Sequence, residues 1–188
     1  MRGCELISTT LGRIKTKPRT THDVVKATGI GYLPQMRLVG ELRDSGLIVP
    51  VGHRRAPNNG HGGIAVVYGF REGEAVITGR ESTRNYLRLW NALLEADSAE
   101  AIAEDCGRHS RQVRISLNIM HKHHLVRIAG WQRNRDGGPT ALWMLGDTRE
   151  TRDTPRPRAI TEHESYLRVK QRKADRMLFD AFTWRLAA

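Results

Sequence analysis

The chain has 188 residues, of which 39% are hydrophobic, 27% charged and only 6% aromatic. This composition excludes a disordered or collagen-like chain and predicts a folded protein with small, mainly aliphatic cores. Lysine and arginine number 31 against 20 acidic residues, and the formal net charge of +11 attracts polyanions.

The apolar stretches of the chain are short. The longest, near 63–70, is far below the roughly 20 residues that cross a bilayer. Residues 1–15 lack the apolar core of a secretory signal. We therefore expect no membrane partner and a cytoplasmic location, either at the nucleoid or, for a phage protein, in the host cytoplasm. In that reducing compartment Cys4 and Cys106 are expected to be free thiols.

Residues 1–70 are predicted to form a first module. A second helix is expected over 21–28, capped by Thr20 or Thr21, and a third over 33–45. Two short strands then flank a loop rich in glycine and asparagine. The opening helix is indicated by apolar residues at helical spacing: Leu6, Ile7, Leu11 and Ile14.

A connector over 71–83 leads to a second module, 84–146, with the same predicted order. It has a helix over 84–96, a short helix ending near Cys106, a third helix that Ser110 caps, and two strands around a polar turn. Fully extended, the connector would reach roughly 43 Å. That length would set the modules on adjacent groove segments of one duplex, about 34 Å apart.

The two modules repeat each other at an offset of 78 residues, the separation of Gly29 and Gly107. Matches at apolar and turn positions, with different polar residues between them, are typical of two copies of one fold. The matched pairs are Val24 and Ile102, Val39 and Leu117, Leu42 and Met120, Leu47 and Leu125, Ile48 and Val126, and Gly52 and Gly130.

The last part of the chain divides in two. Residues 147–161 are polar and rich in proline and arginine, which predicts an extended linker. Residues 162–188 are predicted to form an amphipathic helix with a broad apolar stripe. This stripe is expected either to cover the modules of its own chain or to form a homodimer with a second copy.

Both modules contain a helix that ends in a tight polar turn and two apolar residues, DSGLIV over 44–49 and KHHLVR over 122–127. With the order of elements above, these motifs resemble the winged helix-turn-helix family. The resemblance implies an α+β fold, mainly α with small β-wings: two tandem winged modules plus a C-terminal helix. In that family the third helix usually enters the major groove of DNA, and the wing touches the flanking backbone or minor groove.

The charge pattern places the expected DNA contacts mainly in module two. From Cys106 to Arg135 the chain has seven lysines and arginines and no acid. Arginine suits guanine and phosphate, and asparagine suits adenine. The expected contacts of the third helix are Arg108, Ser110, Arg111, Arg114, Asn118 and His121, and those of the wing are Gln132, Arg133, Asn134 and Arg135.

Module one has a smoother and less basic third helix, so its contacts are expected mainly from the wing; otherwise it contacts a protein. Its expected contacts are Gln35, Arg37, Arg54, Arg55, Asn58 and Asn59. The resulting hypothesis is a sequence-specific double-stranded DNA-binding protein, a transcriptional regulator of the kind found in phages, plasmids and bacteria. The alternatives are a replication initiator that binds an origin, and a protein-binding adaptor or inhibitor.

Enzyme chemistry is not expected. The sequence has no phosphate-binding glycine motif that opens a helix and no nucleophile or carboxylate pair placed to act together. A cluster of thiol and imidazole groups lacks the paired spacing of a zinc site and is expected to extend the basic surface. We therefore predict no cofactor, no metal and no small-molecule ligand. The cluster comprises Cys106, His109, His121, His123 and His124.

Overall fold

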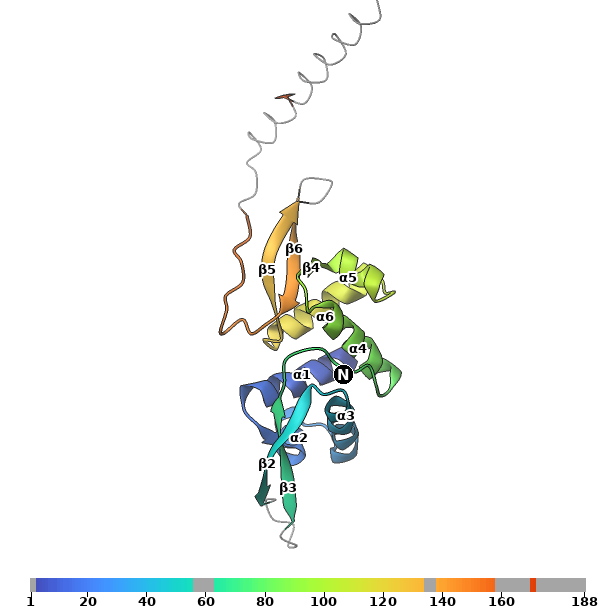
Figure 1. Cartoon of the computed structure of the whole chain (residues 1–188), viewed down its shortest axis with the longest axis vertical. Coiled ribbons are helices and arrows are strands. Elements are labelled where there is room, and N and C mark those ends of the chain that lie inside the picture. Colours follow the sequence, from blue (N-terminus) through green and yellow to red (C-terminus); the bar gives the residue numbers. More distant parts are fainter. Residues whose placement is uncertain (1–2, 56–62, 134–137, 158–169, 172–188) are drawn as a thin grey trace, which may run out of the picture. The chain divides into compact units, whose positions relative to one another are not determined.

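The computed structural model describes residues 3–55, 63–133, 138–157 and 170–171. The chain divides into two compact units, Met1–Pro155 and Arg156–Ala188. All of the helices and strands described below belong to the first unit (Figure 1). The predicted helix over 162–188 lies outside the described residues, except for two helical residues at 170 and 171.

The first half of this unit begins with α1, whose Ile7, Leu11 and Ile14 are buried on one side. Thr20 caps α2 as expected, in a reciprocal pair of hydrogen bonds with Asp23. The strands form an antiparallel sheet in the order β1–β3–β2. The elements are α1 (Gly3–Thr16), β1 (Arg19–Thr20), α2 (Thr21–Thr28), α3 (Tyr32–Asp44), β2 (Ile48–Arg55) and β3 (Ile64–Phe70).

The second half has the same order, and its sheet runs β4–β6–β5. Two predictions need correction. The first helix begins and ends earlier than the predicted 84–96, and His109 caps α6 in place of Ser110, because its Nδ1 accepts a hydrogen bond from the backbone N–H of Arg111. The elements are α4 (Glu81–Ala92), β4 (Asp97–Ser98), α5 (Ala99–Asp105), α6 (Ser110–Lys122), β5 (Val126–Arg133) and β6 (Pro139–Leu145).

The two halves agree in local backbone detail. The first five elements of each half begin 78 residues apart. Gly29 and Gly107 have positive φ values of 69° and 60° at the same turn, and Gly46 and His124 have values of 82° and 58° at the next. Within the described residues the fold thus has six helices and two small antiparallel sheets, which confirms the α+β expectation.

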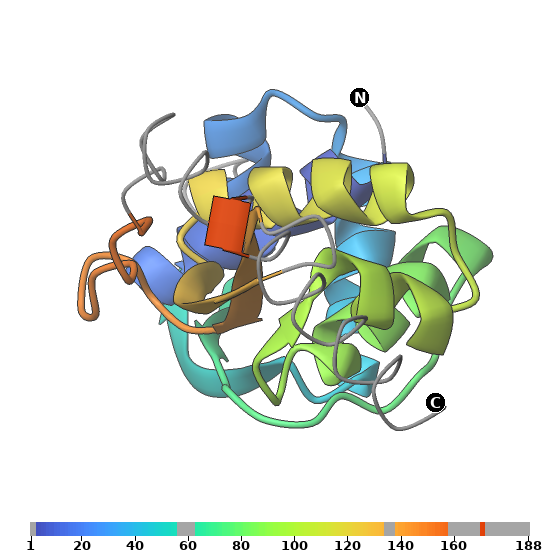
Figure 2. The ribbon, with the colours of Figure 1, turned by 90° about the horizontal axis from the view of Figure 1, so that it is seen from above.

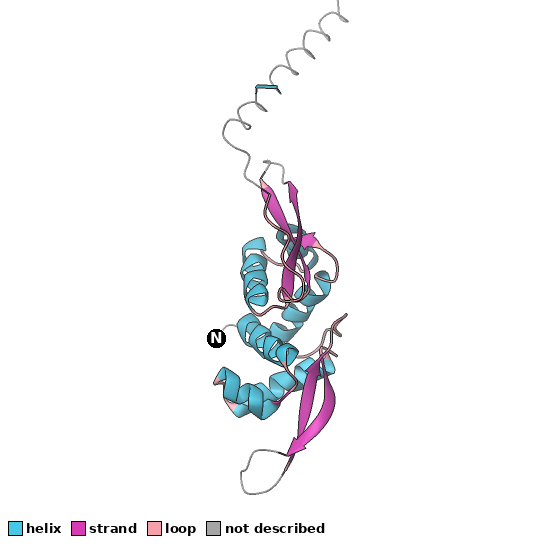
Figure 3. Cartoon of the chain, turned by 90° about the vertical axis from the view of Figure 1, so that its left-hand side faces the viewer, coloured by secondary structure: helices cyan, strands magenta, loops and turns pink. Residues whose placement is uncertain are grey.

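The two halves share one hydrophobic core. Helix α1 of the first half lies against α4 and α6 of the second (Figure 2). At the contact between α1 and α4, the buried hydroxyl of Ser8 donates to the hydroxyl of Tyr86, 3.2 Å away. Ser8 and Tyr86 are themselves equivalent positions of the repeat. The β2–β3 and β5–β6 hairpins extend in opposite directions from these helices (Figure 3).

The connector between the halves is fixed by hydrogen bonds. The indole N–H of Trp90 donates to the carbonyl of Gly73 at 2.9 Å. The side-chain amide of Asn91 pairs with both the N–H and the carbonyl of Ala75, each at 2.8 Å. Ala75 is buried as well. The connector is therefore part of the packed structure and does not use the full extended reach that its length allows.

The segment after β6 also departs from the expected linker. Strand β5 lies at the edge of its sheet, where its outer N–H and C=O groups need partners. The backbone N–H of Ile128 donates to Asp153 at 2.7 Å, and the N–H of Thr154 donates to the carbonyl of Ile128 at 2.9 Å. Asp153 and Thr154 thus lie beside β5 and cover part of its edge.

None of the helices in the described part of the chain has the length and apolar composition needed to span a bilayer.

Two helical glycines, Gly12 and Gly40, have very different surroundings. A Cβ at Gly12 of α1 would lie 2.9 Å from the carbonyl oxygen of His123, a backbone atom that cannot easily move, whereas a Cβ at Gly40 of α3 would meet nothing within 4 Å. We expect Gly12→Ala to lower the free energy of unfolding by about 1–2 kcal/mol, because α1 must shift away from the end of α6. Gly40→Ala should raise it by about 0.5–1 kcal/mol through helix propensity.

The free energies of unfolding of both variants are measured by urea denaturation monitored by circular dichroism. A stabilising effect of Gly12→Ala as large as that of Gly40→Ala would contradict the close approach of α1 to α6.

Candidate nucleic-acid interface

One face of α6 is polar, basic and exposed. Arg111, Arg114 and Asn118 are exposed, as the helical spacing predicted. The opposite side of the helix is anchored in the core by three buried residues, Val113, Leu117 and Met120. Because the core holds one side, the other side is presented to solvent on a fixed helix. No acidic residue occurs within α6.

Arg114 is engaged in an ion pair at the edge of this face. Its guanidinium donates to the carboxylate of Glu100 on α5, and both side chains are exposed. An exposed pair of this kind contributes roughly 0–1 kcal/mol. Within the described residues, Arg111 forms no ion pair. The two arginines therefore differ in how readily they can take a new anionic partner.

Three other predicted contacts are half-buried rather than exposed. Arg108 is half-buried and borders a cavity between α4 and α6. Ser110 is half-buried at the start of α6. His121 is half-buried, with its Nε2 2.6 Å from a carboxylate oxygen of Asp153 and its ring edge-on to Trp143. Helical spacing places His121 on the same side of α6 as Arg114 and Asn118, but the segment after β6 returns to this position and covers part of its ring.

The other histidines near α6 are also held by protein contacts. His123 Nε2 lies 3.2 Å from the hydroxyl of Thr9 on α1. Burial lowers the pKa of His123, and the neighbouring charge of Lys122 lowers it further. His124 bonds to the hydroxyl of Thr148. These side chains do not form the open basic surface that we expected. In the described part of the chain, no three His, Cys, Asp or Glu side chains are grouped as metal ligands.

The β5–β6 hairpin of module two adds charge near its end. Gln132 and Arg133 are exposed there. Asn134 and Arg135 lie outside the described residues. Arg133 closes β5 opposite Pro139, and its equivalent in module one is Arg55, which closes β2 opposite Ile64. The ends of the two hairpins therefore carry the same charge at the same register.

One predicted contact of module one is wrong. Gln35 is fully buried, and its amide Nε2 donates to the hydroxyl of Thr10 at 2.9 Å. Its Oε1 has no hydrogen-bond partner. Gln35 occupies the core position that Val113 occupies in module two. The alignment of Gln35 with Val113 in the repeat predicts this burial, whereas the polar character of Gln35 alone favours a solvent-facing position.

The exposed face of α3 differs in character from that of α6. Tyr32, Leu33 and Met36 are 51%, 62% and 45% exposed. We call these three residues the α3 apolar face. Arg37 is exposed beside them, as expected. In module two the corresponding positions of Leu33 and Met36 are Arg111 and Arg114. The two third helices therefore present different chemistry at equivalent places.

The positive charge of the β2–β3 hairpin in module one is partly neutralised by Asp23. Arg54 contacts the carboxylate of Asp23 at 2.7 Å. Burial alone would raise the pKa of Asp23, but hydrogen bonds from the Thr20 backbone and from Arg54 outweigh it and lower this pKa. Arg55 is exposed. Asn58 and Asn59 lie outside the described residues. Arg55 is thus the better placed of the two arginines for a phosphate.

Three residues that were not predicted as contacts lie beside the exposed face. Lys122 and Ile115 are exposed on α6 itself, and helical spacing from Arg111 and Asn118 identifies both. Arg13 is exposed on α1, close enough to the end of α6 for its charge to act on His123. No spacing rule connects Arg13 to α6, because they belong to different halves of the chain.

Comparison with known proteins gives no relative from which a function could be inferred. No family model matches the chain, and no curated protein matches it. A function must therefore be argued from the chain's own residues. The strongest starting point is the exposed face of α6, with Arg111, Arg114, Ile115, Asn118 and Lys122 and without an acid.

Proposed function

We propose that this chain is a sequence-specific double-stranded DNA-binding protein, acting as a transcriptional regulator and built from two tandem winged helix-turn-helix modules. In this proposal α6 enters the major groove and the β5–β6 hairpin contacts the adjacent backbone or minor groove. The acid-free, exposed face of α6 is the observation that carries it.

The residues of this face match what base edges require. Arg111 and Arg114 can donate to the two acceptors of guanine, and the amide of Asn118 can pair with adenine. Ile115, 39% exposed between them, can contact a thymine methyl group. Lys122, further along the helix, is suited to a phosphate. The net charge of +11 favours the approach of DNA from a distance.

Module one is proposed to contact protein with its third helix. The α3 apolar face lacks donors for bases, and large exposed apolar side chains grouped on one helix are typical of protein contacts. This observation favours a second role, as an adaptor that joins DNA to a protein partner. DNA reading is then the task of one module. Selection from a random DNA pool at two salt concentrations should return a short, non-palindromic site.

The first prediction concerns Arg111 and Asn118. We expect Arg111→Ala and Asn118→Ala each to weaken binding to the selected site by about 1–3 kcal/mol and to relax specificity at one position. Fluorescence anisotropy with labelled DNA measures both effects. Arg84→Ala, an exposed arginine on α4, serves as the control for lost charge. Equal losses in all three variants would show that α6 does not read bases.

The ion pair with Glu100 leads to a second prediction. Glu100→Gln removes a negative charge beside the exposed face and frees Arg114 for DNA. We expect tighter DNA binding by up to about 1 kcal/mol, in line with the strength of an exposed pair. The double variant Glu100→Gln with Arg114→Ala should lose the gain that depends on Arg114. An unchanged or weakened affinity in Glu100→Gln would place Arg114 outside the interface.

The two hairpins are compared through their equivalent arginines. Arg133→Gln should lower affinity for all DNA sequences and reduce the slope of log affinity against log salt by roughly one unit, because one phosphate contact is lost. Arg55→Gln should leave the slope unchanged if module one faces a protein. An equal reduction of the slope in both variants would mean that both hairpins lie on DNA. An unchanged slope in both variants would mean that neither hairpin belongs to the interface.

A further inference from the structure

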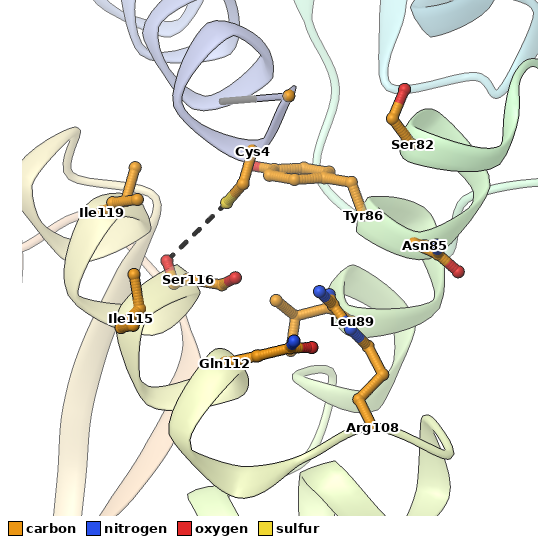
Figure 4. A pocket seen from close by; sticks show the side chains of 11 residues that line it. Cys4, Ser82, Asn85, Tyr86, Leu89, Arg108, Gln112, Ile115, Ser116 and Ile119 are labelled. Carbon is orange, nitrogen blue, oxygen red and sulfur yellow. Dashed lines mark hydrogen bonds between the residues drawn. The ribbon is translucent and has the colours of Figure 1, made fainter. Parts of the chain in front are cut away.

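A cavity of about 520 Å³ lies where α1, α4 and α6 meet (Figure 4). Small-molecule sites in proteins typically have volumes of roughly 300–1,000 Å³. Its walls come from both halves of the chain: Cys4 from α1, Asn85 and Leu89 from α4, and Gln112 and Ile119 from α6. Because the halves share one core, the cavity is held between elements whose positions are fixed.

The polar side chains of the cavity wall are open to solvent: Gln112 is exposed, and Asn85 and Arg108 are half-buried. Within the described residues, the side chains of Asn85, Arg108 and Gln112 have no hydrogen-bond or ion-pair partner. Arg108 and Gln112 extend into the space between α4 and α6 (Figure 4). None of the residues lining the cavity is acidic. The wall therefore offers one positive charge and two amides, and it contains no carboxylate that would repel an anion.

The remaining wall is apolar. Ile115 and Ile119 of α6 supply its accessible apolar surface, and Leu89 lies fully buried behind it. Ile115 keeps 39% of its surface exposed. Water in this part of the cavity would contact methyl groups on one side, and its replacement by an apolar group is favourable. The cavity thus combines a cationic end with an aliphatic side.

We propose that this cavity binds a small organic carboxylate with an apolar body. One guanidinium matches one carboxylate through two parallel hydrogen bonds. In this arrangement Arg108 holds the carboxylate, Gln112 and Asn85 donate to its oxygens or to a neighbouring polar group, and the apolar body lies on Ile115 and Ile119. The sequence offered no sign of this site, because its residues come from three separated segments.

In this proposal Arg108 binds a small ligand and does not contact DNA. Arg108 was expected to contact DNA, but its half-buried side chain points into the cavity. The ligand would touch one flank of α6, next to the face that carries Arg111 and Asn118. Binding of the ligand itself does not depend on the proposed DNA-binding function and is measured without DNA.

Methyl NMR of the full chain provides the test. Protein labelled at isoleucine δ1 methyls is titrated with acetate, hexanoate, benzoate and phenylacetate, and with their primary amides. We expect saturable shifts of the Ile115 and Ile119 methyls with one or more of the three larger carboxylates, and weak or no shifts with acetate or the amides. Ile77 of the connector and Ile64 of β3 do not line the cavity and serve as internal controls.

Two variants establish the chemistry. Arg108→Gln should weaken carboxylate binding about tenfold or more, since a charge-assisted pair is lost. Arg84→Gln removes an equal charge from an exposed site that does not line the cavity and should leave binding unchanged. The isoleucine spectrum of each variant shows that the fold is intact.

The proposal would be overturned if none of the carboxylates produced saturable shifts of the Ile115 and Ile119 methyls. Equal shifts with a carboxylate and its amide, or equal weakening by both arginine variants, would also overturn it. Loss of DNA affinity in Arg108→Gln, without any carboxylate shift, would return Arg108 to the DNA interface. If carboxylates bind while DNA selection fails, the ligand site stands and the DNA-binding proposal falls.

Discussion

The close packing of α1 against α4 and α6 determines most of this structure. At Gly12 the absence of a side chain lets α1 approach the backbone at the end of α6. Ser8 and Tyr86 join α1 and α4 inside the shared core. Without this contact the two halves would be separate small folds on a linker. With it, the position of α6 depends on a helix from the other half of the chain.

This packing divides the surface of α6 into three parts with different roles. One side is the core anchor, formed by Val113, Leu117 and Met120. The flank next to α1 and α4 borders the cavity and carries Gln112 and Ile119. The remaining face is basic, free of acid and exposed. A helix held on two sides loses little further entropy when its third side meets a ligand, which favours specific recognition on that face.

The duplication has kept the fold and changed the surface. The side-chain caps at Thr20 and Ser98 recur at equivalent positions, as do the positive φ values at two turns, because the backbone path requires them. The third helices differ where neither the core nor the turns constrain them, with Leu33 and Met36 at the places of Arg111 and Arg114. The strongest departure within the core is Gln35, which replaces a valine and is paired with Thr10 of α1.

Local sequence patterns determined the helices and the two hairpins of the described residues, their order and the outward face of α6, but they did not indicate the two-residue strands β1 and β4. Helical spacing, the Thr20 cap and the glycine turns act over a few residues, so they can be identified without knowing the fold. Only the tertiary structure decided the fixed connector, the return of Asp153 to His121, the burial of Gln35 and the cavity around Arg108. Each of these depends on segments far apart in the chain that meet because one shared core is buried, and no local pattern specifies such a meeting.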